Sequence, residues 1–160
     1  MPVARFPVFS FFFLVFLLIL FSCDSKRFYE ENKTLPEGVW KRNGKVAFEV
    51  PVTDTAAAYD LFLNVRNSGD YPYSNLYFFI HTRFPDGRIA HDTVECQLAG
   101  YDGKWLGSGI GSVKFNRFLF QKGVFFRIPG KYIFELEQAM RETELKGIRD
   151  VGIRIEKQKP

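Results

Sequence analysis

Apolar and polar residues alternate with a period of two along most of the chain after residue 38. Residues 46–50, 59–65 and 76–84 each place an apolar side chain at every second position, with Thr82 as the exception. This period is typical of strands with one buried face. The string Pro85-Asp86-Gly87 predicts a tight hairpin turn, because proline presets the first corner and glycine tolerates positive φ. We therefore expect a β-hairpin centred on residue 86.

Further strands are predicted at residues 90–98, 113–120, 124–128, 131–138 and 151–157. Residues 135–146 contain good helix formers, so we expect a strand there that runs into a short turn or helix before Gly147. About eight or nine short strands with regular turn signals indicate an all-β fold, an antiparallel β-sandwich. A jelly roll is the preferred topology, although periodicity does not reveal the order of the strands.

The N-terminal stretch is apolar from residue 8 to residue 21, with Ser10 as its only interruption. Secretory signal peptides need about 7 to 15 apolar residues, whereas a spanning helix needs roughly 20. The ending Leu20-Phe21-Ser22-Cys23 resembles a bacterial lipobox, although Phe21 is bulkier than usual. The predicted organisation is a lipoprotein signal peptide (1–22), a polar tether lipidated at Cys23 (23–36) and a β-sandwich domain (37–160). The alternative is an N-terminal membrane anchor that is never cleaved.

Charge and cysteine content exclude several classes of function. The formal net charge is +4 without any basic tract, so no nucleic-acid binding is expected. If Cys23 carries lipid, Cys96 has no disulfide partner. Cys96 lies in phase with Val94 and Leu98, so it is predicted to be a small buried hydrophobic residue rather than a catalytic thiol.

Three groups of residues could carry chemistry, and each has a plainer interpretation. The glycines of residues 103–111 lack the Gly-Lys-Ser/Thr ending of a phosphate loop, so they predict a long loop with Trp105 folded over the edge of the core. His81 and His91 flank the predicted hairpin and could lie close together. With Asp92 or Glu95 they would form a metal corner, but exposed histidines are the ordinary case and no metal is predicted.

Glu135 and Glu137 share one predicted strand face. A glycosidase needs two carboxyl groups across a cleft, and neighbouring outward residues on one strand form none. We therefore expect a solvated face, and neither an enzyme nor a cofactor is predicted.

Four aromatic residues fall in predicted loops: Tyr71, Tyr73, Tyr101 and Trp105. Loop aromatics could stack on sugar rings or contact a partner protein, because both uses bury large amphipathic surfaces. They could equally be tucked over the ends of the sandwich. The sequence leaves both possibilities open.

Several strings together resemble the GldH family of gliding-motility lipoproteins from Bacteroidota. They are Tyr71-Pro72-Tyr73-Ser74-Asn75-Leu76-Tyr77-Phe78-Phe79-Ile80, Phe84-Pro85-Asp86-Gly87, Asp92-Thr93-Val94-Glu95, Gly103-Lys104-Trp105-Leu106-Gly107-Ser108-Gly109 and Gly147-Ile148-Arg149-Asp150-Val151-Gly152-Ile153-Arg154. The resemblance implies a lipoprotein of the cell envelope, expected at the outer membrane, that is associated with gliding motility and the type IX secretion apparatus. It brings no catalytic residues, and Cys23 is the only functional position that it transfers.

Two strings also resemble the short O-glycosylation motif of Bacteroidota, Asp54-Thr55-Ala56 and Asp92-Thr93-Val94. Thr55 is the stronger candidate because it lies in a predicted loop. We thus predict a non-enzymatic subunit of an envelope assembly, held in the membrane by lipid on Cys23, with other gliding or secretion proteins as partners. The alternative function is a carbohydrate-binding module of the jelly-roll type, with a glycan as ligand.

Overall fold

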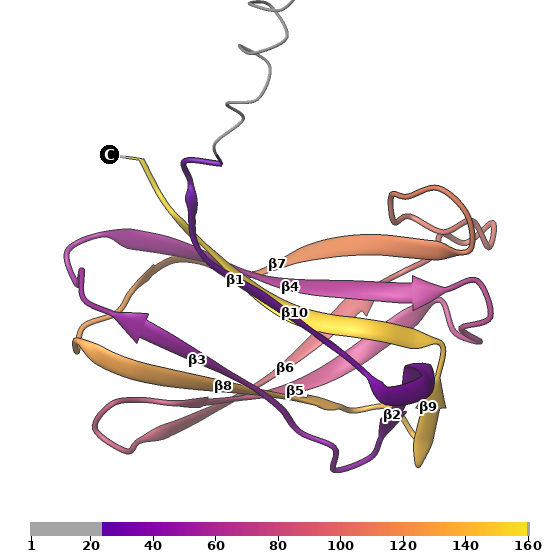
Figure 1. Cartoon of the computed structure of the whole chain (residues 1–160), viewed down its shortest axis with the longest axis horizontal. Coiled ribbons are helices and arrows are strands. Elements are labelled where there is room, and N and C mark those ends of the chain that lie inside the picture. The colour runs from indigo at the N-terminus through magenta and orange to yellow at the C-terminus, as the bar shows by residue number, and fades with distance from the viewer. Residues whose placement is uncertain (1–23, 160) are drawn as a thin grey trace, which may run out of the picture.

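Two four-stranded antiparallel sheets face each other in the computed structural model, which describes residues 24–159 (Figure 1). Sheet 1 has the strand order β1-β10-β4-β7, and sheet 2 has the order β3-β8-β5-β6. A short pair, β2 and β9, closes one end. The elements are β1 (Arg27–Thr34), a 3-10 turn (Pro36–Gly38), β2 (Val39–Lys41), β3 (Val46–Val52), β4 (Ala58–Ser68), β5 (Asn75–Arg83), β6 (Ile89–Gln97), β7 (Val113–Phe125), β8 (Gly130–Gln138), β9 (Glu144–Lys146) and β10 (Ile148–Lys157).

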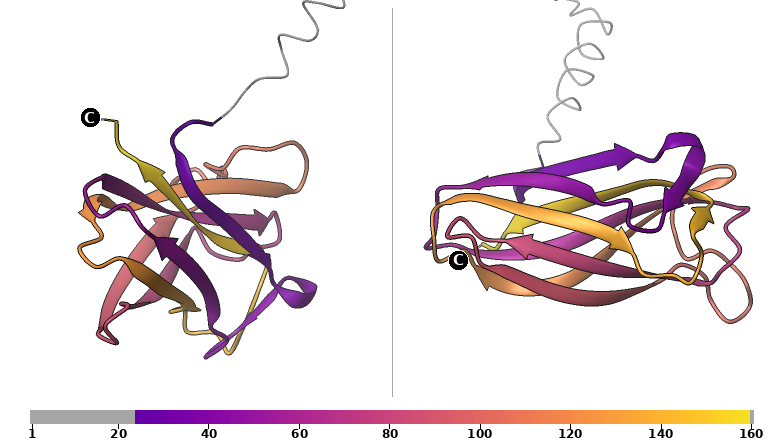
Figure 2. Two further views of the ribbon diagram at one scale, coloured as in Figure 1. Left: turned by 60° about the vertical axis from the view of Figure 1, so that its left-hand side comes forward. Right: turned by 90° about the horizontal axis from the view of Figure 1, so that it is seen from below.

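The order of the eight long strands is that of a jelly roll. The chain crosses from one sheet to the other after β1, β3, β4, β6, β7 and β8, and only the β5–β6 hairpin stays within one sheet. Each sheet is therefore assembled from segments far apart in the sequence, as the two views of Figure 2 show. This arrangement is a double-sheet jelly roll. The prediction of an all-β sandwich with this topology is confirmed.

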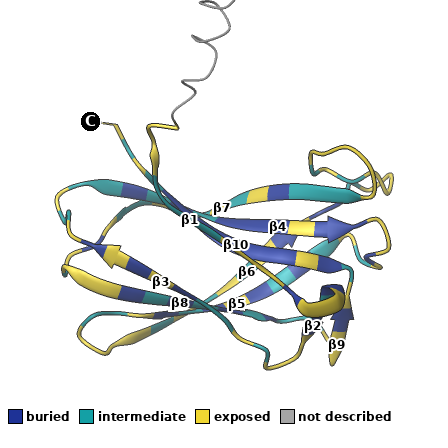
Figure 3. Cartoon of the chain, in the orientation of Figure 1, coloured by how far each residue is buried: buried dark blue, intermediate teal, exposed yellow. Residues whose placement is uncertain are grey.

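The core lies between the sheets and is filled by alternate residues of nearly every strand (Figure 3). Tyr59, Leu61, Leu63 and Val65 of β4 are at most 1% exposed, and the intervening side chains point outward. Burial of alternate side chains is what the period of two requires. The predicted strands at residues 46–50, 59–65 and 76–84 and the turn at residue 86 are thus confirmed.

The predicted tether is wrong for most of its length. Residues 27–34 form strand β1, which pairs with β10 from Arg27 opposite Glu156 to Thr34 opposite Asp150. The register shifts between Arg27 and Tyr29, so two aromatic residues, Phe28 and Tyr29, both pack toward the core. This irregularity hides the period of two, and the outward positions are polar for a reason given below. The sandwich domain therefore begins near residue 27 rather than residue 37.

Of the short turn or helix expected before Gly147, the turn is what forms, because the chain leaves β8, bends over residues 139–143 and enters β9. One smaller expectation is corrected. The two strands expected between residues 113 and 128 are one strand, β7, with an irregular pairing near Gly123, whose φ is 66°. Among the described residues, no helix is long and apolar enough to cross a membrane. The predicted signal peptide and Cys23 lie outside the described residues.

Candidate functional site

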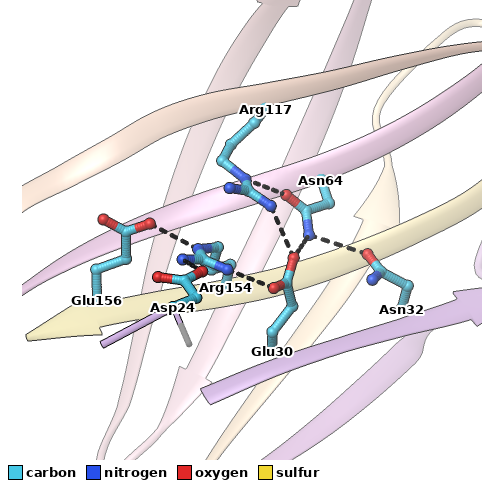
Figure 4. A network of polar contacts seen from close by, with 7 residues as sticks. All are labelled: Asp24, Glu30, Asn32, Asn64, Arg117, Arg154 and Glu156. Atoms are coloured by element: carbon cyan, nitrogen blue, oxygen red, sulfur yellow. Dashed lines mark hydrogen bonds and ion pairs between the residues drawn. The ribbon is translucent and has the colours of Figure 1, made fainter. Parts of the chain in front are cut away.

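The outer face of sheet 1 carries a network of charged and amide side chains next to the first described residue of the chain (Figure 4). We call it the anchor network; its members are Asp24, Glu30, Asn32, Asn64, Arg117, Arg154 and Glu156. They come from the segment before β1 and from all four strands of sheet 1. Antiparallel pairing places Glu30 of β1 and Phe62 of β4 on either side of Arg154. The network therefore exists only when the whole sheet is assembled.

Arg154 is the centre of the anchor network. Its side chain is 5% exposed and contacts three carboxylates. Its Nη1 lies 2.5 Å from Glu30 Oε2, its Nε lies 2.6 Å from Glu156 Oε1, and its Nη2 donates to Asp24. Burial alone would lower the pKa of Arg154, but these carboxylates outweigh it and raise the pKa. Arg154 is therefore a permanent charge whose burial depends on its acidic partners.

Glu30 links Arg154 to the rest of the network. Its Oε1 accepts hydrogen bonds from Asn64 Nδ2 at 2.9 Å and from Arg117 Nη2 at 2.8 Å. Burial would raise the pKa of Glu30, but the hydrogen bond from Asn64 and the charges of Arg154 and Arg117 hold it below its usual range. Asn64 also donates to Asn32 at 3.0 Å. Such a fully bonded set fixes the position of every member.

Asp24 connects this network to the predicted lipid attachment. The hydrogen bond from Arg154 is the main reason that the pKa of Asp24 is lowered. Asp24 directly follows Cys23, and consecutive Cα atoms are about 3.8 Å apart. A lipid on Cys23 would thus be attached beside the sheet, with no flexible segment between them. Sequence reasoning missed the network, and its one signal was a charged residue in the middle of the apolar strand β10.

The second candidate region is the connection formed by residues 100–112, between β6 and β7. Its backbone is fixed at several points: Gly100 N donates to Lys104 O, Ser108 and Phe115 form a bridge, and Gly69 N donates to Ser112 O at 2.7 Å. Gly107 packs on the Asn116 side chain so closely that an added Cβ would lie 2.7 Å from it. Trp105 packs against the core, as predicted. The connection is therefore an ordered loop.

The loop aromatics fall into two groups. Tyr71 is 3% exposed and donates to Asn75 O at 2.8 Å, so it cannot serve as a surface contact, and this candidate is corrected. Tyr73 is half-buried, packs edge-on against Tyr71 and donates to Glu142 Oε1 at 2.6 Å. Tyr101, by contrast, is fully exposed. Sequence reasoning missed its apolar neighbours Leu106 and Ile110, which are 62% and 105% exposed.

The predicted proximity of the two histidines is confirmed, but the metal corner does not form. His81 and His91 pair across β5 and β6, with their Nδ1 atoms 2.6 Å apart. Asp92 lies on the other face of β6, because successive strand residues alternate, and Glu95 accepts a hydrogen bond from Asn75 instead. Among residues 24–159, no group of three or more possible ligands is arranged for a metal ion.

The remaining candidates are placed as follows. Cys96 is fully buried, and burial raises the pKa of its thiol to about 12, so the prediction of a buried hydrophobic residue is confirmed. Glu137 lies 3.4 Å from His81 and Glu135 lies 3.2 Å from Lys45, both on the outer face of sheet 2. Thr55 lies in the loop between β3 and β4 and is half-buried.

A hollow of about 550 Å³ lies beside the β2–β9 pair. Leu35, Val39, Trp40 and Val46 give it an apolar lining, and Lys41 and Glu144 are among its charged residues. Its lining residues include two carboxylates, Glu37 and Glu144, and no histidine. The largely apolar lining suits the binding of an apolar side chain.

Comparison with known proteins adds the family. The model of the GldH lipoprotein family matches residues 27–155. A gliding motility lipoprotein GldH homolog from Christiangramia forsetii is 43% identical over 157 residues, which cover 93% of this chain and 96% of that protein. The gliding motility lipoprotein GldH of Flavobacterium johnsoniae is 37% identical over 150 residues, covering 89% and 92%. Among solved structures, the Yersinia pseudotuberculosis-derived mitogen is similar with a TM-score of 0.37 and 6% identity, covering 82% of this chain and 88% of the mitogen, a likeness too weak to carry an argument.

Proposed function

Because the chain belongs to the GldH lipoprotein family, we propose that it is a lipid-anchored, non-enzymatic subunit or accessory of the gliding-motility and type IX secretion apparatus. The lipid is carried by Cys23, and the expected location is the outer membrane. Two relatives are named gliding motility lipoproteins, and the similarity to this chain covers nearly the whole length of each. Their names support the gliding-motility part of the proposal.

The observation that carries the interaction role is the ordered loop of residues 100–112. It presents Tyr101, Leu106 and Ile110 to solvent on a backbone that is fixed by hydrogen bonds and by the packing of Trp105. Exposed apolar side chains on a rigid loop are suited to binding a protein, because little conformational entropy is lost on contact. The loop therefore replaces Tyr71 and Tyr73 as the proposed partner contact.

The pairing, burial and position of the titratable groups support the non-enzymatic part of the proposal. The acids and arginines of the anchor network are bound to one another, the Cys96 thiol is buried, and the two histidines lie on the outer face of a sheet. Catalysis generally needs such groups to converge in a pocket.

The alternative, a carbohydrate-binding module, would need exposed aromatic rings in one plane. Tyr71, Tyr73 and Trp105 are packed into the end of the sandwich, and Tyr101 is the one member of that predicted set that is exposed. Within the described residues, these aromatics do not form a stacking surface, so no specific observation favours this function.

The test is photo-crosslinking in cells with a tagged, lipidated copy that carries a photoreactive residue at position 101. The same residue at position 93, on the outer face of sheet 2, is the matched control. Adducts with secretion or motility proteins from position 101, absent from position 93, are the expected result. Equal adducts from both positions, or retention of the purified protein on a polysaccharide column without any protein adduct, would overturn the proposal.

A further inference from the structure

The outer face of sheet 1 carries polar and apolar side chains next to one another. The anchor network crosses all four strands, with Asn64 on β4 and Arg117 on β7 (Figure 4). Over β4 and β7, Phe62 and Leu119 pair in register, and Leu119 is 49% exposed. Phe115 lies on the same outer face, opposite Arg66. Such an amphipathic surface is typical of an interface between water and an apolar phase.

The chain that precedes the described residues ends at this same face. The described chain starts above sheet 1 in Figure 1, on the side turned away from sheet 2, and Asp24 at this start is held by Arg154 (Figure 4). Cys23 is the next residue toward the N-terminus, so its Cα lies within about 3.8 Å of the Asp24 Cα. A lipid on Cys23 therefore brings the membrane to the outer face of sheet 1.

The charges of this face also suit a lipid surface. The carboxylates of Asp24, Glu30 and Glu156 are all bound by Arg154. The buried Asp150 is bound by Arg66 at 2.7 Å. With Arg117, three arginines face these four carboxylates, so one negative charge is left unbalanced and the set repels anionic headgroups less than free carboxylates would.

A polar hollow lies at the end of this face remote from Asp24. It has a volume of about 330 Å³ and is lined by Asn32, Asn64, Val65, Arg66, Phe115 and Asp150. Arg66 has an exposed guanidinium there, and Arg117 neighbours Phe115 with its guanidinium 5.4 Å from the ring centre. Guanidinium groups bind phosphate well, so this end of the face has groups that suit phospholipid headgroups.

We infer that the outer face of sheet 1 lies flat on the membrane that holds the lipid anchor, with Leu119 at the acyl boundary and Arg66 at the phosphate level. The inference rests on the proposed lipidation of Cys23 and goes beyond it, because it assigns one face of the domain to the bilayer. The outer face of sheet 2 then points away from the membrane. This face carries ion pairs that are accessible to solvent, such as Lys131–Glu49 and Lys45–Glu135.

The test measures which face touches lipid. The full lipidated protein is prepared as two variants, Leu119→Cys and Thr93→Cys, each labelled with an environment-sensitive fluorophore. Thr93 is exposed on β6 in sheet 2 and is the matched control, and Cys96 stays unlabelled because it is fully buried. Each protein is placed in vesicles of phosphatidylethanolamine and phosphatidylglycerol, with ordinary or brominated acyl chains. Circular dichroism checks that both variants keep the fold.

The expected result is loss of fluorescence at position 119 in brominated vesicles, with no loss at position 93. Amphipathic helices bury their apolar side about 5–10 Å into the headgroup and acyl boundary, and a sheet face seated to that depth is within reach of the bromine atoms. A protein that floats with the vesicles and has an acylated mass, yet shows no quenching at position 119, overturns the orientation and leaves the lipoprotein assignment intact. A mass without acyl chains overturns both.

Discussion

Replacing Arg154 by methionine should destabilise the domain more than the loss of any exposed arginine. The substitution keeps much of the side-chain length but leaves Glu30 and Glu156, which are 16% and 20% exposed, without their main partner. Removing one partner of a buried ion pair costs about 3–5 kcal/mol. Glu30 keeps Arg117 and Asn64, so we expect the lower end, about 3 kcal/mol. For a domain of this size that corresponds to a fall in Tm of about 10 °C.

The measurement is urea unfolding followed by the fluorescence of Trp40 and Trp105, in a Cys23→Ser background that removes the lipid. Arg88→Met is the matched control, because Arg88 forms an exposed pair with Asp86 across one turn. Exposed pairs contribute little to stability. An Arg154→Met variant that is no less stable than Arg88→Met would refute the view that Arg154 stabilises the fold through its buried acidic partners.

Three further predictions concern stability at low pH, the cost of glycine substitutions and the reactivity of the Cys96 thiol. The pKa of Glu30 is lowered in the fold, so its contribution is present above its unfolded pKa of about 4.3 and is lost as the pH falls through the folded value. In the Glu30→Gln variant the free energy of unfolding should therefore fall less steeply below about pH 4 than in the unchanged protein, as measured by urea unfolding at a series of pH values. Gly147→Ala should cost more than Gly103→Ala in the same assay, because both have positive φ but only at Gly147 would a Cβ lie 2.8 Å from Tyr71; equal costs would contradict this. Cys96 should react with a thiol reagent only as fast as the protein unfolds, and rapid native labelling would disprove its burial.

Local features of this fold could be predicted from sequence, because they depend on neighbours along the chain. The β5–β6 hairpin and the proximity of His81 and His91 follow from one turn and a period of two. The number of predicted strands and the turns between them likewise indicate the all-β fold class. The burial of Cys96 was predictable because it lies in phase with Leu98 on a short apolar pattern.

The anchor network could not be predicted, because its bonds join residues that only the folded sheet brings together. Asp24 and Arg154 are separated by 130 positions, and Glu30 and Arg154 by 124. Polar residues before and within β1 therefore gave the appearance of a tether. Their outward side chains are polar because they bind Arg154 and Asn64, and this reason is invisible until β1, β10 and β4 are adjacent.

The proposed membrane-facing orientation and the proposed loop contact constrain each other. The loop of residues 100–112, which leads into β7, rises on the same side of the molecule as the start of the described chain in Figure 1. If the outer face of sheet 1 lies on the bilayer, Tyr101 reaches only partners that lie in the membrane or at its surface. A crosslink from Tyr101 to a protein embedded in the same membrane satisfies both proposals. A crosslink to a protein that never touches the membrane would contradict the orientation, even where that protein belongs to the secretion apparatus.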